Sequence, residues 1–118
     1  MMTKFESWTD CGVGIVEVTG DLSPDQTVPF HAALRAALDA ATLPYLVLVC
    51  GGIRRLSMGP IAVFLSTDLA VRGRGGRVVL AAPDARLRRV LRLGGADGFE
   101  VYPDLETALD TIRGRSDL

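Results

Sequence analysis

Short apolar runs of strand type alternate along the chain with longer stretches whose apolar residues recur at helical spacing. Runs rich in valine, isoleucine and leucine occupy positions 13–18, 46–49 and 78–80. The stretches between and after them have apolar residues three and four apart, which predicts four amphipathic helices. Strands that alternate with helices form a mostly parallel sheet with right-handed crossovers. The pattern therefore predicts an α/β fold.

Turn and cap residues place the first elements. Residues 3–8 are a candidate partner for the strand at 13–18, across a turn at Cys11 and Gly12, and this hairpin would add an antiparallel edge to the sheet. The first helix is predicted to begin with Thr27 as its N-cap, so that Pro29 falls in the first turn, where a missing N–H costs nothing.

The remaining helices have equally clear starts. The second is predicted to follow Ser57, with Ile61, Leu65 and Leu69 as its buried stripe and Phe64 alongside. A short strand is expected at 99–101. The predicted N-caps of the last two helices are Asp84 and Asp104. The predicted order is β, β, α, β, α, β, α, β, α, within a single domain of residues 1–118.

Composition excludes several kinds of function. A chain of 118 residues with 48% apolar residues is typical of one globular domain. One histidine, His31, and two cysteines, Cys11 and Cys50, cannot build a Cys₄, Cys₂His₂ or His₃ metal site. No recognisable nucleophile accompanies His31, so we expect neither an enzyme nor a bound cofactor.

The same sequence indicates a compartment. The longest apolar stretch, 43–50, is far shorter than the ~20 residues that a membrane span needs. Residues 1–10 carry Lys4, Glu6 and Asp10 and hold no apolar leader segment. We therefore expect a cytoplasmic protein with reduced cysteines and no membrane insertion.

Six segments together have the order and spacing of a known family. VEVTGDL at 16–22 ends in a Gly-Asp-Leu turn, and the other segments are 27–39, 46–53, 75–80, 86–97 and 104–109. In this arrangement they resemble the STAS domain of bacterial anti-sigma factor antagonists. The resemblance implies a STAS-like fold of about four helices. It also implies a regulatory protein–protein interaction domain that binds an anti-sigma factor by partner switching.

The chain departs from this family at the start of the second helix. The family's antagonists carry Asp-Ser-Ser-Gly there, and the second serine is phosphorylated. The corresponding positions here are Ser57, Met58, Gly59 and Pro60. Because Gly59 has no hydroxyl, we expect that phosphorylation does not occur at the usual place. Ser57, two residues early, is the displaced candidate for phosphorylation, and its alternative interpretation is a helix N-cap.

The segment 51–60 is the predicted functional loop. Arg54 and Arg55 precede the N-terminus of the second helix, where free N–H groups and the helix dipole favour an anion. Asp21 and Ser23, in and after the Gly-Asp-Leu turn, complete the predicted partner-binding set with residues 57–60. The alternative interpretation is that both arginines are solvated loop residues.

The formal net charge of −1 hides an uneven distribution. Residues 54–92 hold nine arginines against Asp68 and Asp84, whereas the segments on either side are net acidic. The near-neutral total argues against a nucleic-acid binder. The basic segment predicts a partner with an acidic contact surface. Four of its arginines belong to the third helix, whose alternative interpretation is a solvated face: Arg86, Arg88, Arg89 and Arg92.

Two further hypotheses remain open. STAS-like domains in other settings bind nucleotides or lipids, or serve as subunits of transport complexes, and such a function would need a pocket near Asp21, Ser57 and Gly59. Trp8 lies near the predicted edge strand, where it either covers the edge or contacts a second copy of the chain in a homodimer.

Overall fold

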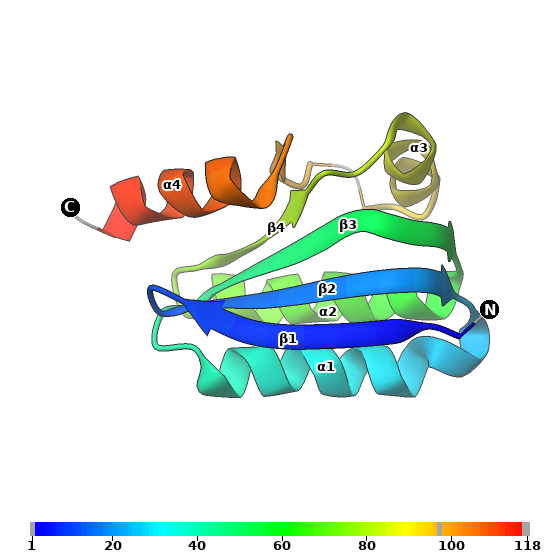
Figure 1. The fold of residues 1–118 in the computed structure, drawn as a ribbon, viewed down its shortest axis with the longest axis horizontal. Coiled ribbons are helices and arrows are strands. Elements are labelled where there is room, and N and C mark those ends of the chain that lie inside the picture. Colours follow the sequence, from blue (N-terminus) through cyan, green and yellow to red (C-terminus); the bar gives the residue numbers. More distant parts are fainter. Residues whose placement is uncertain (1, 97, 117–118) are drawn as a thin grey trace.

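A five-stranded sheet with helices on both faces forms the centre of the computed structural model (Figure 1). The structure describes residues 2–96 and 98–116, and residue 97, within one of the segments quoted for the resemblance, lies outside them. The elements follow the predicted order: β1 (Lys4–Asp10), β2 (Val13–Leu22), the 3-10 helix η1 (Pro24–Gln26), α1 (Thr27–Ala40), β3 (Tyr45–Leu56), α2 (Met58–Arg72), β4 (Arg77–Ala81), α3 (Ala85–Leu93), β5 (Val101–Tyr102) and α4 (Leu105–Ser116).

The strands lie side by side in their sequence order. β1 pairs with β2 in antiparallel fashion, and β2, β3, β4 and β5 are parallel neighbours. Cys11 and Gly12 connect β1 to β2 with φ angles of 51° and 84°. Two successive residues with positive φ form the type of two-residue turn that matches the twist of a hairpin. The predicted α/β fold and its antiparallel edge are confirmed.

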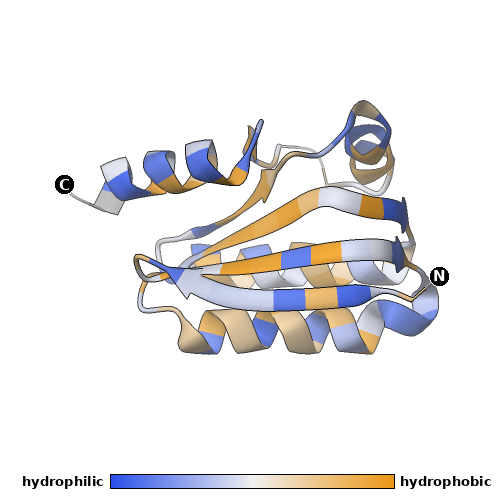
Figure 2. Cartoon of the chain, in the orientation of Figure 1, coloured by the Kyte–Doolittle hydropathy of each residue, from blue (hydrophilic) through white to orange (hydrophobic). Residues whose placement is uncertain are grey.

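The helices divide the core into two layers. α1, α2 and α3 cover one face of the sheet around Val16, Val18 and Leu80, whereas α4 covers Ile15 and Val79 on the other face. The central strands therefore carry apolar residues in succession, as strands buried on both faces do (Figure 2). Parallel strands end at a common edge, so the starts of α1, α2 and α3 all follow the carboxyl ends of β2, β3 and β4 (Figure 1).

The start of α1 differs from the prediction. Its N-cap is Gln26 and Thr27 is the first helical residue, because the chain first forms η1 over Pro24–Gln26. The Thr27 hydroxyl donates to the carbonyl oxygen of Pro24 at 2.7 Å, so it continues this turn instead of capping the helix.

α2 is rotated from the predicted orientation. Leu69 is 69% exposed, whereas Asp68 is only 3% exposed. Asp68 turns inward because its carboxylate accepts the backbone N–H of Val78 at 2.9 Å and an N–H of Arg72 at 2.7 Å. The predicted stripe is therefore wrong at Leu69, since the last turns of α2 pack through an ion pair as well as through apolar residues.

Candidate functional site

The end of the sheet at which β2 and β3 finish carries the predicted site residues. In the register of these two parallel strands, Asp21 is the partner of Arg55 and Leu22 is the partner of Leu56. The backbone N–H of Ser57 then donates to the carbonyl oxygen of Leu22 at 2.9 Å. The structure thus brings Asp21 and Ser57 to one edge, although 36 positions separate them. We call this edge the α2-start surface and define it by its residues: Asp21, Ser23, Arg54, Arg55, Ser57, Met58, Gly59 and Pro60.

The predicted loop at 51–60 is wrong over its first half. β3 continues through Gly51 and Gly52 to Leu56, paired along β2 across two register shifts. A side chain at Gly52 would come within about 3.0 Å of the carbonyl oxygen of Val18, so glycine here permits the close approach of the two backbones. The glycine pair marks an irregular ladder and not the end of a strand.

Arg54 and Arg55 therefore extend from a strand with a fixed backbone. Both are exposed, and they line a shallow hollow together with Arg86 and Leu87 of α3. Arg86 is placed by its own contact, because its Nη2 donates to the carbonyl oxygen of Arg54 at 2.6 Å. Three arginines thus contribute to the lining of one hollow. The contribution of Arg86 was missed from the sequence, because the contact joins residues 32 positions apart.

The start of α2 has an unusual cap. Ser57 occupies the N-cap position with extended backbone angles, as predicted, but its hydroxyl makes no capping hydrogen bond. Met58, the first helical residue, is 65% exposed. The first turn of α2 holds no acidic side chain. Because Pro60 has no N–H, the first turn offers the backbone N–H groups of Met58 and Gly59, which the Ser57 side chain does not cap.

Gly59 is enclosed by α1. A β-carbon at this position would lie 2.5 Å from Oγ1 of Thr27 and 3.4 Å from its methyl group. Real β-carbons do not approach that closely, so a serine at position 59 would displace Thr27. The side chain of Thr27 occupies the space that a larger residue 59 would need.

Ser23, a residue of the α2-start surface, forms a local pair with Asp25. The Ser23 hydroxyl donates to the Asp25 carboxylate, and this hydrogen bond lowers the pKa of Asp25 below its usual value. Both residues lie at η1, so Asp25 adjoins the α2-start surface through Ser23.

Within residues 2–96 and 98–116, no group of three or more His, Cys, Asp or Glu side chains is placed to hold a metal ion. Both cysteines are free thiols, with Cys11 exposed and Cys50 buried. Of the helices in the described part of the chain, none has the length and apolar character required to cross a membrane. His31 is exposed on α1.

Comparison with known proteins identifies the family. The family model described as "Mlab, STAS domain" matches residues 10–107. No curated protein sequence matches the chain.

Solved structures share the fold at low sequence identity. The anti-sigma factor antagonist SpoIIAA in its unphosphorylated form is 16% identical with a TM-score of 0.81, over 94% of this chain and 97% of that chain. An anti-sigma factor antagonist from Mycobacterium paratuberculosis is 24% identical with a TM-score of 0.81, over 95% of both chains. A murine anion transporter of the Solute Carrier 26 family is 20% identical with a TM-score of 0.76, over 91% of this chain but only 18% of that chain. The fold, the element order and the family match agree, and the chain belongs to the STAS domain family.

Proposed function

We propose that this STAS domain is a regulatory protein–protein interaction domain, which binds an anti-sigma factor or another regulatory protein through the α2-start surface. The observation that carries the proposal is the exposed Met58 side chain, which follows the exposed Arg54 and Arg55 by four and three positions. An exposed apolar residue beside arginines is a common composition for the centre of a protein interface. The shared fold of antagonists such as SpoIIAA supports the choice of partner class.

The partner's contact surface is expected to be acidic. Arg54, Arg55 and Arg86 line one hollow, and the first N–H groups of α2 receive no side-chain cap from Ser57. Carboxylates pair well with guanidinium groups and with helix N-termini. A partner that presents aspartates or glutamates would satisfy both.

A binding titration with charge-reversed variants tests the surface. We expect R54E/R55E to weaken binding of the purified anti-sigma factor at least ~tenfold in isothermal titration calorimetry, because two favourable charges become unfavourable. The matched control R35E/R74E changes the net charge equally at exposed arginines outside this surface, and it should change Kd less than ~threefold. Equal weakening by both variants would contradict the proposed site.

Binding is proposed to be independent of phosphorylation at the usual place. Gly59 offers no hydroxyl, and Thr27 fills the space beside it. When the protein is incubated with an anti-sigma factor kinase and ATP, we expect no stoichiometric phosphate on residues 57–60 by peptide mass spectrometry. Stoichiometric phosphate on Ser57 would show that the displaced acceptor is used and would refute this part of the proposal.

A role as an accessory subunit of a transport complex is the second candidate, supported by the match to one part of an anion transporter. A nucleotide or lipid pocket near Asp21, Ser57 and Gly59 would need more space than the structure has beneath that surface. The enclosed space lined by Leu22 and Pro60 has a volume of only ≈ 10 Å³, about enough for one water molecule. A thermal shift produced by nucleotide or lipid and abolished by changes at Asp21 would favour the second candidate.

A further inference from the structure

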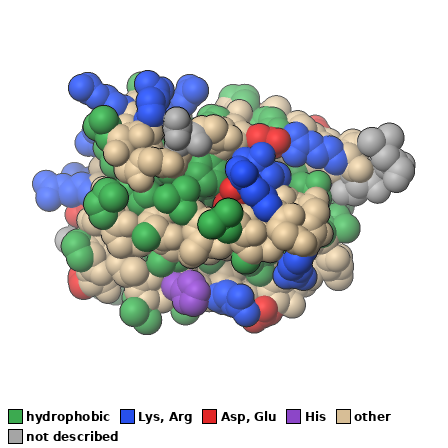
Figure 3. All heavy atoms as spheres, turned by 180° about the vertical axis from the view of Figure 1, so that it is seen from behind, with side chains coloured by type: hydrophobic (Ala, Val, Ile, Leu, Met, Phe, Trp, Pro, Cys, Tyr) green, Lys and Arg blue, Asp and Glu red, His purple; other side chains and the backbone are tan. Residues whose placement is uncertain are grey.

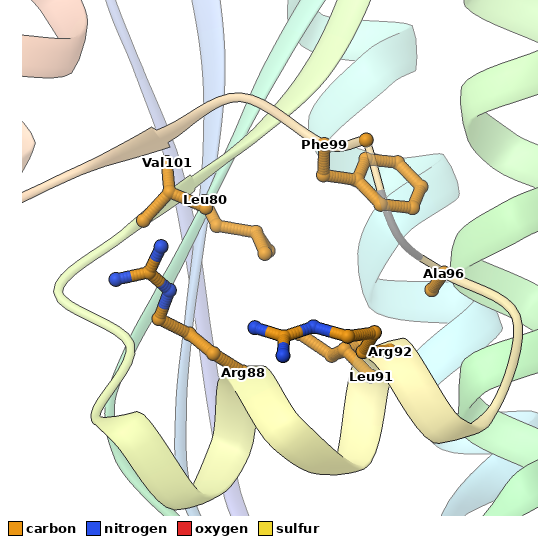
Figure 4. Close-up of a pocket in the computed structure, with 8 residues that line it drawn as sticks. Leu80, Arg88, Leu91, Arg92, Ala96, Phe99 and Val101 are labelled. Carbon is orange, nitrogen blue, oxygen red and sulfur yellow. The ribbon is translucent and has the colours of Figure 1, made fainter.

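An open hollow lies between α3 and the segment that leads into β5, away from the α2-start surface. Its volume is ≈ 100 Å³, and Figure 4 shows the side chains around it. Two of the lining residues are arginines, Arg88 and Arg92. The other lining residues are small or apolar: Leu80, Leu91, Ala96, Gly98, Phe99 and Val101.

The floor of the hollow is apolar and preformed. Leu80 is 1% exposed, Leu91 is 6% exposed and Ala96 is 4% exposed, so the floor consists of core residues. The Phe99 ring is held in place by the Phe64 ring of α2, with their centroids 4.2 Å apart. The ring contact ties the Phe99 wall of the hollow to α2.

Small residues follow α3 beside the hollow. Gly94 and Gly95 end α3, Gly95 and Gly98 have positive φ angles of 85° and 86°, and Ala96 contributes only a methyl group. β5 is only two residues long, and it pairs with Leu80 and Ala81 of β4, so that Val101, the partner of Leu80, also lines the hollow.

Two guanidinium groups flank the hollow. Arg88 and Arg92 lie one helical turn apart on α3, and in Figure 4 the Arg92 guanidinium extends across the hollow while that of Arg88 rises toward Val101. Like charges at this spacing destabilise a helix by a few tenths of a kcal/mol. Of the residues that the structure describes, none places a carboxylate within salt-bridge distance of either group, whereas Arg72, Arg113 and Arg115 each have such a partner.

We propose that this hollow binds an amphipathic organic anion. Its carboxylate or phosphate group would pair with Arg88 and Arg92, and its apolar part would lie against Leu80, Leu91 and Phe99. A cavity of 150 Å³ accepts a benzene molecule, so ≈ 100 Å³ suits an apolar group no larger than one ring or a short alkyl chain.

A ligand with a longer apolar chain could extend into a neighbouring hollow. A second open hollow adjoins the first, because both are lined by Arg88 and Val101, and its other walls are Ala82, Pro83, Tyr102 and Pro103. The ligand class therefore extends from short organic acids to single acyl chains with an anionic head. Neither hollow includes a residue of the α2-start surface, so this ligand site can be tested independently of the proposed function.

NMR titration of the full chain tests the proposal. Hexanoate, hexyl phosphate and dodecanoate (below its micelle concentration) would be added to isotope-labelled protein, with inorganic phosphate and hexan-1-ol as half-probes. We expect the six-carbon anions to shift the Gly98 amide and the methyl groups of Leu80 and Leu91. We expect each half-probe to bind at least ~tenfold more weakly than the complete probes. Tighter binding of dodecanoate than of hexanoate would identify an acyl-chain ligand, and equal binding would identify a short organic anion.

Matched variants separate charge from shape. R88Q/R92Q should weaken the binding of hexanoate at least ~tenfold, because both charge-assisted contacts are lost. The control R74Q/R89Q removes the same charge from arginines outside the hollow, and it should change the Kd of hexanoate less than ~twofold. The A96V variant adds two methyl groups to the wall and should weaken hexanoate while the backbone spectrum stays native. Unchanged binding in R88Q/R92Q, or inorganic phosphate as tight as hexyl phosphate, would overturn the proposal.

Discussion

The Asp68 carboxylate holds the end of α2 to the start of β4. It is 3% exposed, accepts the Val78 N–H, and lies 2.7 Å from Nε of Arg72 and 3.5 Å from Nε of Arg77. The sequence did not reveal this role, because a charged residue interrupts the apolar periodicity that predicts a buried stripe. Its partners, Arg72 and Val78, lie four and ten positions away, so only the folded chain brings all three together.

Removal of this carboxylate should therefore affect stability strongly. D68A leaves a buried N–H and two arginines without their acceptor, and we expect the free energy of unfolding to fall by about 3 kcal/mol. The control D110A removes an exposed carboxylate from its pair with Arg113, and it should cost no more than ~0.5 kcal/mol. Urea denaturation of both variants checks this, and similar small losses would show that Asp68 is not a structural anchor.

The buried Cys50 thiol makes stability depend on alkaline pH. Burial raises its pKa to about 12, from an ordinary value of 9.0 in the unfolded chain. The raised pKa means that the folded state keeps a proton which the unfolded state loses. The resulting stabilisation of the unfolded state begins near pH 9 and grows toward pH 12.

We therefore expect the stability of C50A to rise relative to that of the wild type as the pH rises. The difference between their unfolding free energies should shift by about 2 kcal/mol in favour of C50A between pH 8 and pH 10.5. Urea denaturation at the two pH values measures the shift. The same difference at both pH values would show that the thiol titrates normally.

At the scale of elements, the helix and strand order was predictable because each element has its own apolar period and its own cap. Asp84 and Asp104 accept the N–H groups of Leu87 and Thr107 at 2.7 Å, as their positions in the sequence predict. The predictions that failed are those in which a tertiary contact overrides a local sequence signal. Glycines at 51 and 52 indicate a strand end, yet pairing with β2 carries β3 on to Leu56.

The contact between α1 and α2 can be tested by a double-mutant cycle. G59S places a side chain 2.5 Å from Oγ1 of Thr27, so it should lower the unfolding free energy by about 1–3 kcal/mol. T27A/G59S should lose less than the sum of its single variants, with a coupling of at least ~1 kcal/mol.

Gly114 on α4 supplies the matched control for this cycle. No atom lies within 4 Å of a β-carbon added there, so G114S should be neutral or slightly stabilising, as expected for an open helical position. Strict additivity of T27A and G59S in chemical denaturation would contradict the packing described for Gly59.

At the scale of the whole molecule, folding divides the basic segment of the sequence. Arg72 and Arg77 pair with Asp68 where β4 begins, whereas the arginines at the end of β3 and on α3 gather at the carboxyl edge of the sheet. Figure 3 shows basic side chains concentrated at the upper left, the end of the molecule that carries α3. A net charge near zero therefore coexists with one strongly basic end.

This distribution explains how far the sequence could predict the site. The nine arginines of residues 54–92 predict a basic region, but not which of them share a surface. The Arg86 contact with Arg54 and the Arg88–Arg92 hollow both depend on where α3 packs, which no local pattern encodes. Gly59, by contrast, was singled out from the sequence, and the structure adds the reason that α1 leaves no room there.

The salt dependence of partner binding tests whether the arginines of the α2-start surface contact the partner. If these arginines face an acidic partner, salt screens the contact over a Debye length of about 10 Å at 0.1 M. Calorimetric titration of the wild-type protein with the anti-sigma factor should show Kd rising at least ~fivefold between about 50 and 300 mM NaCl, and R54E/R55E should lose most of that dependence. A Kd that stays constant over this range would contradict binding of an acidic partner through these arginines.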